Sequence, residues 1–411
     1  EEDDPDWITA KLILTELLNN RAEMKSYDRS VMWNYWGYLY FNEEDYDQAM
    51  YAYEQLLKEP EATIPLRTAS LLTLAQLNLV KERWDAGINL ILQWMDEVET
   101  ITAQSHYLLA SAYFQKTDYV KARTSMEEAI RLAEEEGYRP KENWYVLLAA
   151  CFSELKEKKI ISAQYALEQQ VGIYEILVNY YPKKLYFLQL GGTYQQMDRE
   201  EDYMLTLKAA YEKDLLDKEG EYLALAQMLL LQKNPYWAAQ VLVAGQQKKV
   251  IITDKETGKE ESVVVVKDTE KTLKLLADAW RMAQEIDMAI PVLEKAAKMS
   301  KDGDTYILLG NLYLFEDRME DSIRAIEAGL KKEKVKNRSQ ALLVLGQAHF
   351  ELENFEEAKK QFRAAARDED KRIKKTANSW IKYAENEEIR VKNLALRRDF
   401  IQQSQAKSQN S

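Results

Sequence analysis

A small residue, Gly or Ala, recurs nine times along the chain in similar surroundings. The nine positions are Gly37, Ala75, Ala110, Ala149, Gly191, Ala226, Ala277, Gly310 and Gly346. Steps of 33 to 51 residues separate them, and most are followed about twelve residues later by a second small residue, such as Ala49 or Ala122. This spacing predicts helix pairs that approach closely where small residues face each other. One such pair cannot bury its apolar face alone, so the copies must stack.

The segment WNYWGYLYFNEEDYDQAMYAYEQLL shows the unit most clearly. Aromatic and small residues alternate at fixed spacing in it, at Trp33, Trp36, Gly37, Tyr40, Tyr46, Ala49 and Tyr53. This arrangement resembles the tetratricopeptide repeat (TPR), a helix-turn-helix unit of about 34 residues. The resemblance implies an all-α fold, a right-handed TPR superhelix of about nine repeats.

Composition agrees with a helical solenoid. The 411 residues include only 13 Gly and 7 Pro, and Ala, Leu, Glu, Lys and Gln dominate, which are residues that favour helices. The single cysteine, Cys151, excludes a disulfide scaffold, and no apolar run approaches the length of a membrane span. The chain begins EEDDPDW, so a targeting signal was either never present or has been removed.

Five segments are expected. They are an N-terminal acidic segment with a capping helix at 1–29, repeats one to six at 30–247, a β-hairpin at 248–268, repeats seven to nine at 269–370, and a C-terminal capping helix with a basic disordered tail at 371–411. Asp6 is expected to cap the first helix. Disorder is expected over the last ten residues, 402–411.

The hairpin interrupts a helical chain. The residues KKVIITDKETGKEESVVVVKD contain two β-branched runs, at 250–253 and 263–266, around a charged segment with Gly258, and this pattern predicts two antiparallel strands. A lone two-stranded ribbon is marginally stable. We therefore expect it to pack on the solenoid or to pair with a partner, with Val264 and Val266 as possible contacts.

No catalytic, cofactor-binding or metal-ligating constellation is found. The chain has two histidines, His106 and His349, and the second occupies the large-residue position of repeat nine, which favours packing. No His/Cys spacing suits zinc, and no glycine-rich phosphate loop is present. We therefore predict a protein that is not an enzyme and that needs no cofactor.

In the TPR fold the first helix of each repeat lines a concave groove, through residues three before, one after and four after the small residue. In repeats one to three these positions hold Asn34, Tyr38, Phe41, Leu72, Gln76, Leu79, Tyr107, Ser111 and Phe114. Amides can pair with both groups of an extended peptide backbone, and tyrosine gives contact area at low entropic cost. These nine residues are the predicted protein-binding groove, with the alternative that some of them pack against a neighbouring turn.

Other parts of the groove are less suited to binding. Repeat seven places Lys274, Asp278 and Arg281 at the same positions, which predicts a charged and less adhesive surface. TPR co-chaperones hold an acidic peptide through Lys and Asn in the groove, and here only Asn34 resembles that set. A clamp for an acidic C-terminal peptide is therefore not expected.

Charge is unevenly distributed. The net charge is −13, yet residues 371–411 hold ten basic and four acidic residues, a net of +6. The acidic remainder argues against nucleic-acid binding. The basic tail is expected to be a solubilising helix, or else to touch a membrane or an acidic protein.

Whole segments resemble a narrower family. The segments WNYWGYLYF, RPKENWYVLL, YYPKKLYFLQLGGTYQQ, AAYEKDLLDKEGEYLALAQ and LADAWRMAQEIDMAIPVLEKAAKMSKDGDTYILLG resemble gammaproteobacterial TPR proteins associated with TonB–ExbB–ExbD systems. KENW, PKK and LLDKE fall in inter-repeat loops, which the repeat consensus leaves free. The resemblance implies a periplasmic accessory protein, processed by signal peptidase, in TonB-dependent transport. It also implies TonB, ExbB or ExbD-type components or an outer-membrane receptor as partners.

The sequence thus predicts a non-catalytic protein-protein interaction scaffold that binds a partner peptide or helix in its groove. Two alternatives remain open, a cytoplasmic TPR adaptor and a regulatory subunit whose active site belongs to the partner.

Overall fold

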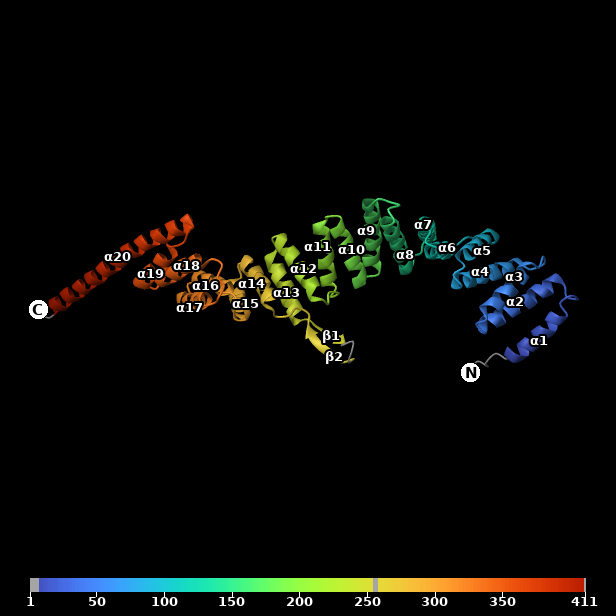
Figure 1. Cartoon of the computed structure of the whole chain (residues 1–411), viewed down its shortest axis with the longest axis horizontal. Helices are drawn as coiled ribbons and strands as arrows, with labels where there is room; N and C mark the ends of the chain where they lie inside the picture. The colour runs from blue at the N-terminus through green and yellow to red at the C-terminus, as the bar shows by residue number, and fades with distance from the viewer. Residues whose placement is uncertain (1–6, 254–257, 410–411) are drawn as a thin grey trace. The chain divides into compact units, whose positions relative to one another are not determined.

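The computed structural model describes residues 7–253 and 258–409 (Figure 1). Two compact units divide the chain, residues 1–206 and residues 207–411. The acidic segment 1–6 with its expected cap Asp6, residues 254–257 of the hairpin, and residues 410 and 411 of the tail lie outside the described residues.

Helices follow one another through the first unit. They are α1 (Trp7–Asn19), α2 (Ser26–Asn42), α3 (Tyr46–Leu57), α4 (Ile64–Val80), α5 (Trp84–Glu97), α6 (Ala103–Gln115), α7 (Tyr119–Glu135), α8 (Glu142–Glu157), α9 (Ala163–Tyr180) and α10 (Lys184–Gln196). The next helix, α11 (Glu200–Glu212), contains the boundary between the units.

Helices also dominate the second unit. They are α12 (Glu219–Leu231), α13 (Pro235–Gln247), α14 (Glu270–Met282), α15 (Ile286–Met299), α16 (Asp304–Phe315), α17 (Met319–Leu330), α18 (Arg338–Glu351), α19 (Phe355–Ala365) and α20 (Lys371–Gln409). Two strands, β1 (Lys249–Thr253) and β2 (Glu260–Val264), lie between α13 and α14. The predicted all-α fold of repeated helix pairs with one small β-hairpin is confirmed.

Small residues set the distance between the helices of a pair. A methyl group on Gly37 of α2 would lie 2.6 Å from the ring of Tyr53 on α3, and one on Gly346 of α18 would lie 2.5 Å from the ring of Phe362. Both distances are shorter than any ordinary contact, so the aromatic ring occupies the space where a side chain would otherwise begin. The pattern of small residues in the sequence therefore has a direct steric cause.

The turn within each repeat uses a residue in the left-handed backbone region. In eight of the nine repeats this residue stands seven positions after the small residue, as Glu44 does after Gly37, and its φ angle is between 55° and 65°. In repeat four the residue is Lys159, ten positions after Ala149, so α8 continues about one turn further past its small residue than the other first helices do. The N–H of the following residue bonds back to the first helix, as Asp45 does to the Tyr40 carbonyl at 2.9 Å. This is the Schellman arrangement that ends a helix.

One polar contact recurs in both units. The hydroxyl of Tyr194 donates to Glu175 at 2.6 Å, and the hydroxyl of Tyr313 donates to Glu294. In each case an arginine five residues after the tyrosine lies over its ring, at 4.6 Å for Arg199. The phenol and the carboxylate belong to successive repeats, so the contact ties one repeat to the next.

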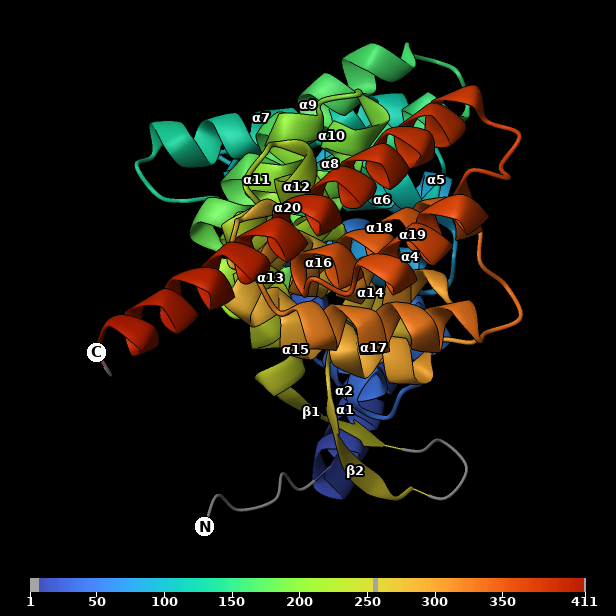
Figure 2. The same ribbon diagram turned by 90° about the vertical axis from the view of Figure 1, so that its left-hand side faces the viewer.

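The β-hairpin is antiparallel, with Val250 opposite Val263 and Ile252 opposite Glu261. Its strand β2 contacts α13, and Figure 2 shows β1 and β2 extending away from the helices of their unit. Ile251 and Ile252 are largely exposed. The second strand ends at Val264, two residues earlier than predicted, because Val265 and Val266 turn back onto α13.

The C-terminal helix α20 is longer than expected. The sequence predicts disorder from residue 402, yet α20 continues as one helix of 39 residues to Gln409. Its first half packs against α19 and α18, with Ala377 and Ala384 buried. Gln, Ala and Lys in the last turns are good helix formers, so the helix continues beyond its contacts.

Candidate functional site

The predicted groove of the first unit lies on the first helices of repeats one to three. Its nine residues come from α2, α4 and α6, and α2 lies directly against α4. Tyr38 and Phe41 on α2 and Gln76 on α4 are exposed, whereas Asn34 and Leu72 are half-buried. Tyr38, Phe41 and Gln76 therefore form the accessible part of the predicted groove.

The remaining predicted residues also hold the fold together. Tyr107 stacks on Trp144 of α8, with ring centroids 5.5 Å apart, and its hydroxyl accepts a hydrogen bond from Asn143 at 2.8 Å. Phe114 contacts the ring of Tyr119. The Ser111 hydroxyl donates to the Tyr107 carbonyl. These side chains pack against their neighbours, as the alternative interpretation expected.

Leu79 behaves in the same way. Its Cδ2 atom occupies the position that a side chain on Gly87 would fill, at 2.6 Å, and it belongs to the apolar cluster between repeats two and three. A substitution at Leu79 would therefore disturb packing before it affected any ligand.

The accessible surface on α2 is longer than predicted. Tyr27, Val31, Asn34, Tyr38 and Phe41 follow at intervals of three and four residues, so they share one face of the helix. Tyr27 is exposed and Val31 is half-buried. The ring of Trp7 from α1 lies 6.0 Å from the ring of Tyr38. Both Tyr27 and Val31 could have been found from the sequence by extending the same spacing two turns towards the start of the helix.

The structure places the two predicted contact residues of the hairpin, Val264 and Val266, in different surroundings. Val266, a predicted contact, is 1% exposed. Its N–H donates to the Gly245 carbonyl at 3.0 Å, and its side chain packs over Gly245, as the ring of Tyr222 also does. It anchors the base of the hairpin and is not available to a partner, which corrects that prediction. Val264 is half-buried, and its role as a contact stays a prediction.

The charged groove positions of repeat seven are internally paired. Lys274 bonds to Glu270 at 2.6 Å, and Arg281 bonds to Asp278 at 3.3 Å. Their charges are thus partly neutralised within α14.

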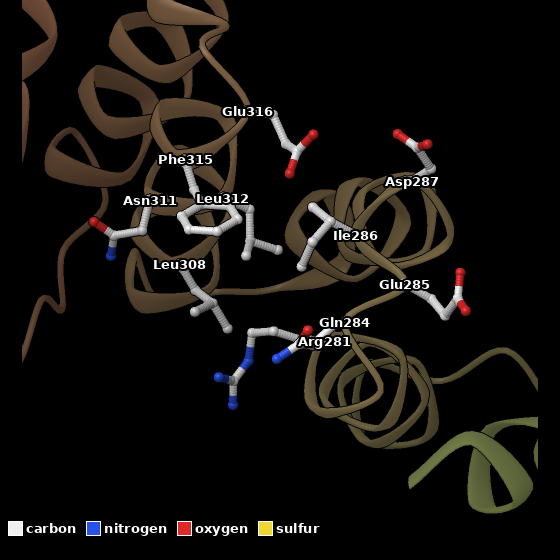
Figure 3. A pocket seen from close by; sticks show the side chains of 10 residues that line it. All are labelled: Arg281, Gln284, Glu285, Ile286, Asp287, Leu308, Asn311, Leu312, Phe315 and Glu316. Atoms are coloured by element: carbon white, nitrogen blue, oxygen red, sulfur yellow. The ribbon is translucent and has the colours of Figure 1, made fainter.

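A pocket of about 630 Å³ nevertheless lies beside repeat seven, between α14, α15 and α16. Figure 3 shows Leu308, Leu312 and Phe315 projecting from α16 towards the side where Ile286 and Arg281 lie. Phe315 is 75% exposed. Around these apolar groups stand the carboxylates of Glu285, Asp287 and Glu316. The pocket therefore has an apolar floor and an acidic rim.

Of the groove positions named in the sequence prediction, only Arg281 lines this pocket, and the apolar residues that form its floor were not among them. Phe315 stands five residues after Gly310, and the same position holds Leu231 in repeat six and Met282 in repeat seven. All three are large, apolar and exposed. The sequence could have indicated this pocket, because a large apolar residue ends the first helix of each of repeats six, seven and eight.

Both histidines and the cysteine are constrained by packing. Burial lowers the pKa of His106 and of His349, and it raises the pKa of Cys151 to about 12, so Cys151 remains a protonated thiol at neutral pH. Over residues 7–253 and 258–409, no three His, Cys, Asp or Glu side chains gather in a way that could hold a metal ion. No helix in that part of the chain is both long and apolar enough to cross a membrane.

Comparison with family models gives two matches, both to models described as tetratricopeptide repeat. One covers residues 103–136 and the other residues 307–372. These segments correspond to α6 with α7 and to α16 through the start of α20. Comparison with curated protein sequences found no match.

Several solved structures are similar to parts of the chain. A structure titled "Crystal structure of MamA" is 20% identical, with a TM-score of 0.35, and the match covers 45% of this chain and 97% of that one. YrrB, described as "a TPR protein with an unusual peptide-binding site", is 12% identical, with a TM-score of 0.38, over 50% of this chain and 96% of its own. A TPR protein from Parabacteroides merdae is 14% identical, with a TM-score of 0.27, over 68% of this chain and 98% of its own.

The family models match one segment in each unit. In both units, glycines also stand where the two helices of a pair approach each other closely. The two matched segments, residues 103–136 and residues 307–372, match the tetratricopeptide repeat, and both units are built of stacked helix pairs.

Proposed function

We propose that this protein is a non-catalytic scaffold that binds an extended peptide or a helix of a protein partner in the groove of its first unit. The observation that carries the proposal is the exposure of Tyr38 and Phe41 on α2 beside Gln76 on α4. Two aromatic rings offer apolar area at low entropic cost, and the amide can pair with a peptide backbone.

The backbone behind these side chains is held firmly. Arg29 of α2 bonds through Nη2 to Glu59 at 2.7 Å and through Nη1 to the Met24 carbonyl at 2.6 Å. Arg67 of α4 makes the equivalent bond to Glu97 at 3.0 Å. A preformed surface loses less entropy when it binds than a mobile one, which favours recognition of a flexible peptide.

We further propose that the partner belongs to a TonB-type system in the periplasm. The support is the resemblance of the inter-repeat loops KENW, PKK and LLDKE. In this account a TonB, ExbB or ExbD-type component or an outer-membrane receptor contributes the bound segment, and a signal peptide has been removed from the chain.

A crosslinking pull-down from native cells tests both statements. The variant is Tyr38→Ala/Gln76→Ala, chosen because these side chains are exposed, whereas Tyr107 and Phe114 also support the fold. Tyr51→Ala is the control, since Tyr51 lies on α3, is similarly exposed and likewise contacts one tryptophan ring.

Recovery of TonB-system proteins by the wild type and the control, but not by the groove variant, is the expected result. Equal recovery by all three would place the contact outside this groove. Recovery of cytoplasmic proteins alone would overturn the periplasmic proposal and leave the groove to be tested with those proteins.

A further inference from the structure

The distal segment of α20, residues 389–401, carries an apolar stripe that is largely exposed. Ile389, Leu396 and Phe400 stand at intervals of seven and four residues, so they lie on one helix face. They are 59%, 67% and 72% exposed. Exposed large apolar residues gathered on one face mark an interaction surface more often than single scattered ones do.

Unpaired positive charge borders this stripe. Arg397 and Arg398 have no carboxylate partner among the described residues, whereas Arg390 and Lys392, about two turns earlier, are paired with Glu387 and Glu388. A partner for this segment must therefore offer apolar surface together with negative charge.

The pocket between α14, α15 and α16 has the complementary character. Its floor is formed by Leu308, Leu312 and Phe315, and Glu285, Asp287 and Glu316 also line it. Figure 3 shows Glu316 near the apolar side chains, and Glu285 and Asp287 beyond Ile286. None of these three carboxylates forms a salt bridge within residues 7–253 and 258–409, and the nearby Arg281 is already paired with Asp278. The pocket thus presents uncompensated negative charge around an apolar floor.

We propose that the distal segment of α20 of one copy docks on the α14–α16 pocket of a second copy. Leu396 and Phe400 contact Leu308 and Phe315, while Arg397 and Arg398 approach the acidic rim. Figure 1 shows the C-terminal end of α20 pointing away from α14, α15 and α16, so the helix meets this pocket on another molecule.

Size sets the expected affinity. Thirteen helical residues span about 20 Å, so the contact belongs to the small interfaces typical of weak association. A dissociation constant of about 1–100 µM is expected. Reciprocal docking gives a closed dimer, and docking in one direction gives longer chains. Both forms of association satisfy the proposal.

Sedimentation velocity of the full chain across a concentration series tests it. Arg397→Glu/Arg398→Glu and Glu285→Lys/Glu316→Lys should each weaken association at least about tenfold, since each places like charges opposite one another. Lys371→Glu/Lys374→Glu is the matched control. It changes the net charge by as much as the arginine variant does, at exposed positions of α20 outside the segment, and should associate as the wild type does. Far-UV circular dichroism checks that all variants fold.

Mixing the two charge-reversed variants gives the sharpest result. An acidic distal segment then meets a basic rim, so association should return to within about threefold of the wild type, and it should weaken as salt rises. A wild type that stays monomeric to about 100 µM, or variants that associate as strongly as it does, would overturn the proposal. Monomers that bind vesicles of anionic lipid would also overturn it and would assign the segment to a membrane surface.

Discussion

The hydroxyl of Tyr194 donates a hydrogen bond to Glu175, 19 residues earlier in the chain, and the hydroxyl of Tyr313 does the same to Glu294 across an equal interval. Both phenols are buried, and burial together with the carboxylate raises the pKa of each. Arg199, which lies over the Tyr194 ring, is paired with Asp202, and Arg318 is paired with Asp321 in the same way. The same four-part arrangement of Glu, Tyr, Arg and Asp thus joins successive repeats in each unit.

Removing one hydroxyl should weaken the unit that contains it. Tyr194→Phe keeps the ring under Arg199 and deletes only the bond to Glu175, so it should cost about 1 kcal/mol in the free energy of unfolding. Urea denaturation measures the loss. Tyr35→Phe on an exposed tyrosine serves as the control, and a loss as large as that of Tyr194→Phe in the control would contradict this account of the contact.

Two glycines should respond in opposite directions to alanine. Gly37→Ala places a methyl group 2.6 Å from the Tyr53 ring and should destabilise by about 1–3 kcal/mol. Gly192, also inside a helix, has no atom within 4 Å of such a methyl group, so Gly192→Ala should stabilise by about 0.5–1 kcal/mol. Thermal denaturation of both variants checks the difference in sign. Equal effects would mean that steric contact does not explain the recurring small residue.

Thr117 is the β-branched member of the turn residues with positive φ, at 65°. β-branched residues are strained in this region, so Thr117→Gly should raise the free energy of unfolding by about 0.5–1 kcal/mol once the greater freedom of glycine in the unfolded chain is included. Thr124→Gly, within α7, is the control and should lower it by about 1 kcal/mol. A destabilised Thr117→Gly would show that its side chain makes a contact that outweighs the strain.

The contact that Glu388 of α20 makes with Lys359 of α19 should weaken at acid pH. Lys359, which is buried, and Lys392 donate hydrogen bonds to Glu388 at 2.7 Å and lower the pKa of that carboxyl from 4.5 to about 2. A carboxyl whose pKa is lower in the folded than in the unfolded chain stabilises the fold fully at pH values above its unfolded pKa. This stabilisation is therefore lost as pH falls from about 4.5 towards about 2. The melting temperature of Glu388→Gln should lie below that of the wild type at neutral pH and converge with it across this window. A constant difference between the two proteins down to pH 2 would contradict the assignment.

The base of the hairpin should matter more to stability than its strands. Val266→Ala shortens a buried side chain that packs over Gly245 and should cost about 1–2 kcal/mol in the free energy of unfolding. Ile251→Lys alters an exposed residue and should change the free energy of unfolding by less than about 0.5 kcal/mol. Hydrogen exchange at α13 and α14 measures both effects, and equal protection in the two variants would contradict the role given to Val266.

The repeat architecture could be predicted because its cause is local. Gly37, Ala75 and their equivalents are small for a steric reason that acts within one helix pair, so the signal returns at every repeat. The hairpin was found for a similar reason, since β-branched runs around Gly258 stand out in a helical chain.

The binding surface could be predicted only in part. Spacing along each helix places Tyr38 of α2 and Tyr107 of α6 on the side predicted to line the groove. Trp144, which covers Tyr107, comes from the following repeat. Likewise, Phe315 appears as a single apolar residue at the end of a helix until α14 and α15 bring Ile286 and the acidic rim around it. Whether a side chain is free or covered depends on neighbours that the pattern of one helix does not identify.

Site-specific photo-crosslinking in living cells tests the central claim most directly. A photoreactive phenylalanine analogue is placed at Tyr38, at Phe41 or, as the control, at Tyr51 on α3. The account predicts a discrete adduct with a partner protein from Tyr38 and Phe41, none from Tyr51, and loss of the adduct when Gln76→Lys is added. Adducts from Tyr51 alone, or equal adducts from all three positions, would contradict a groove on α2 and α4 as the binding surface.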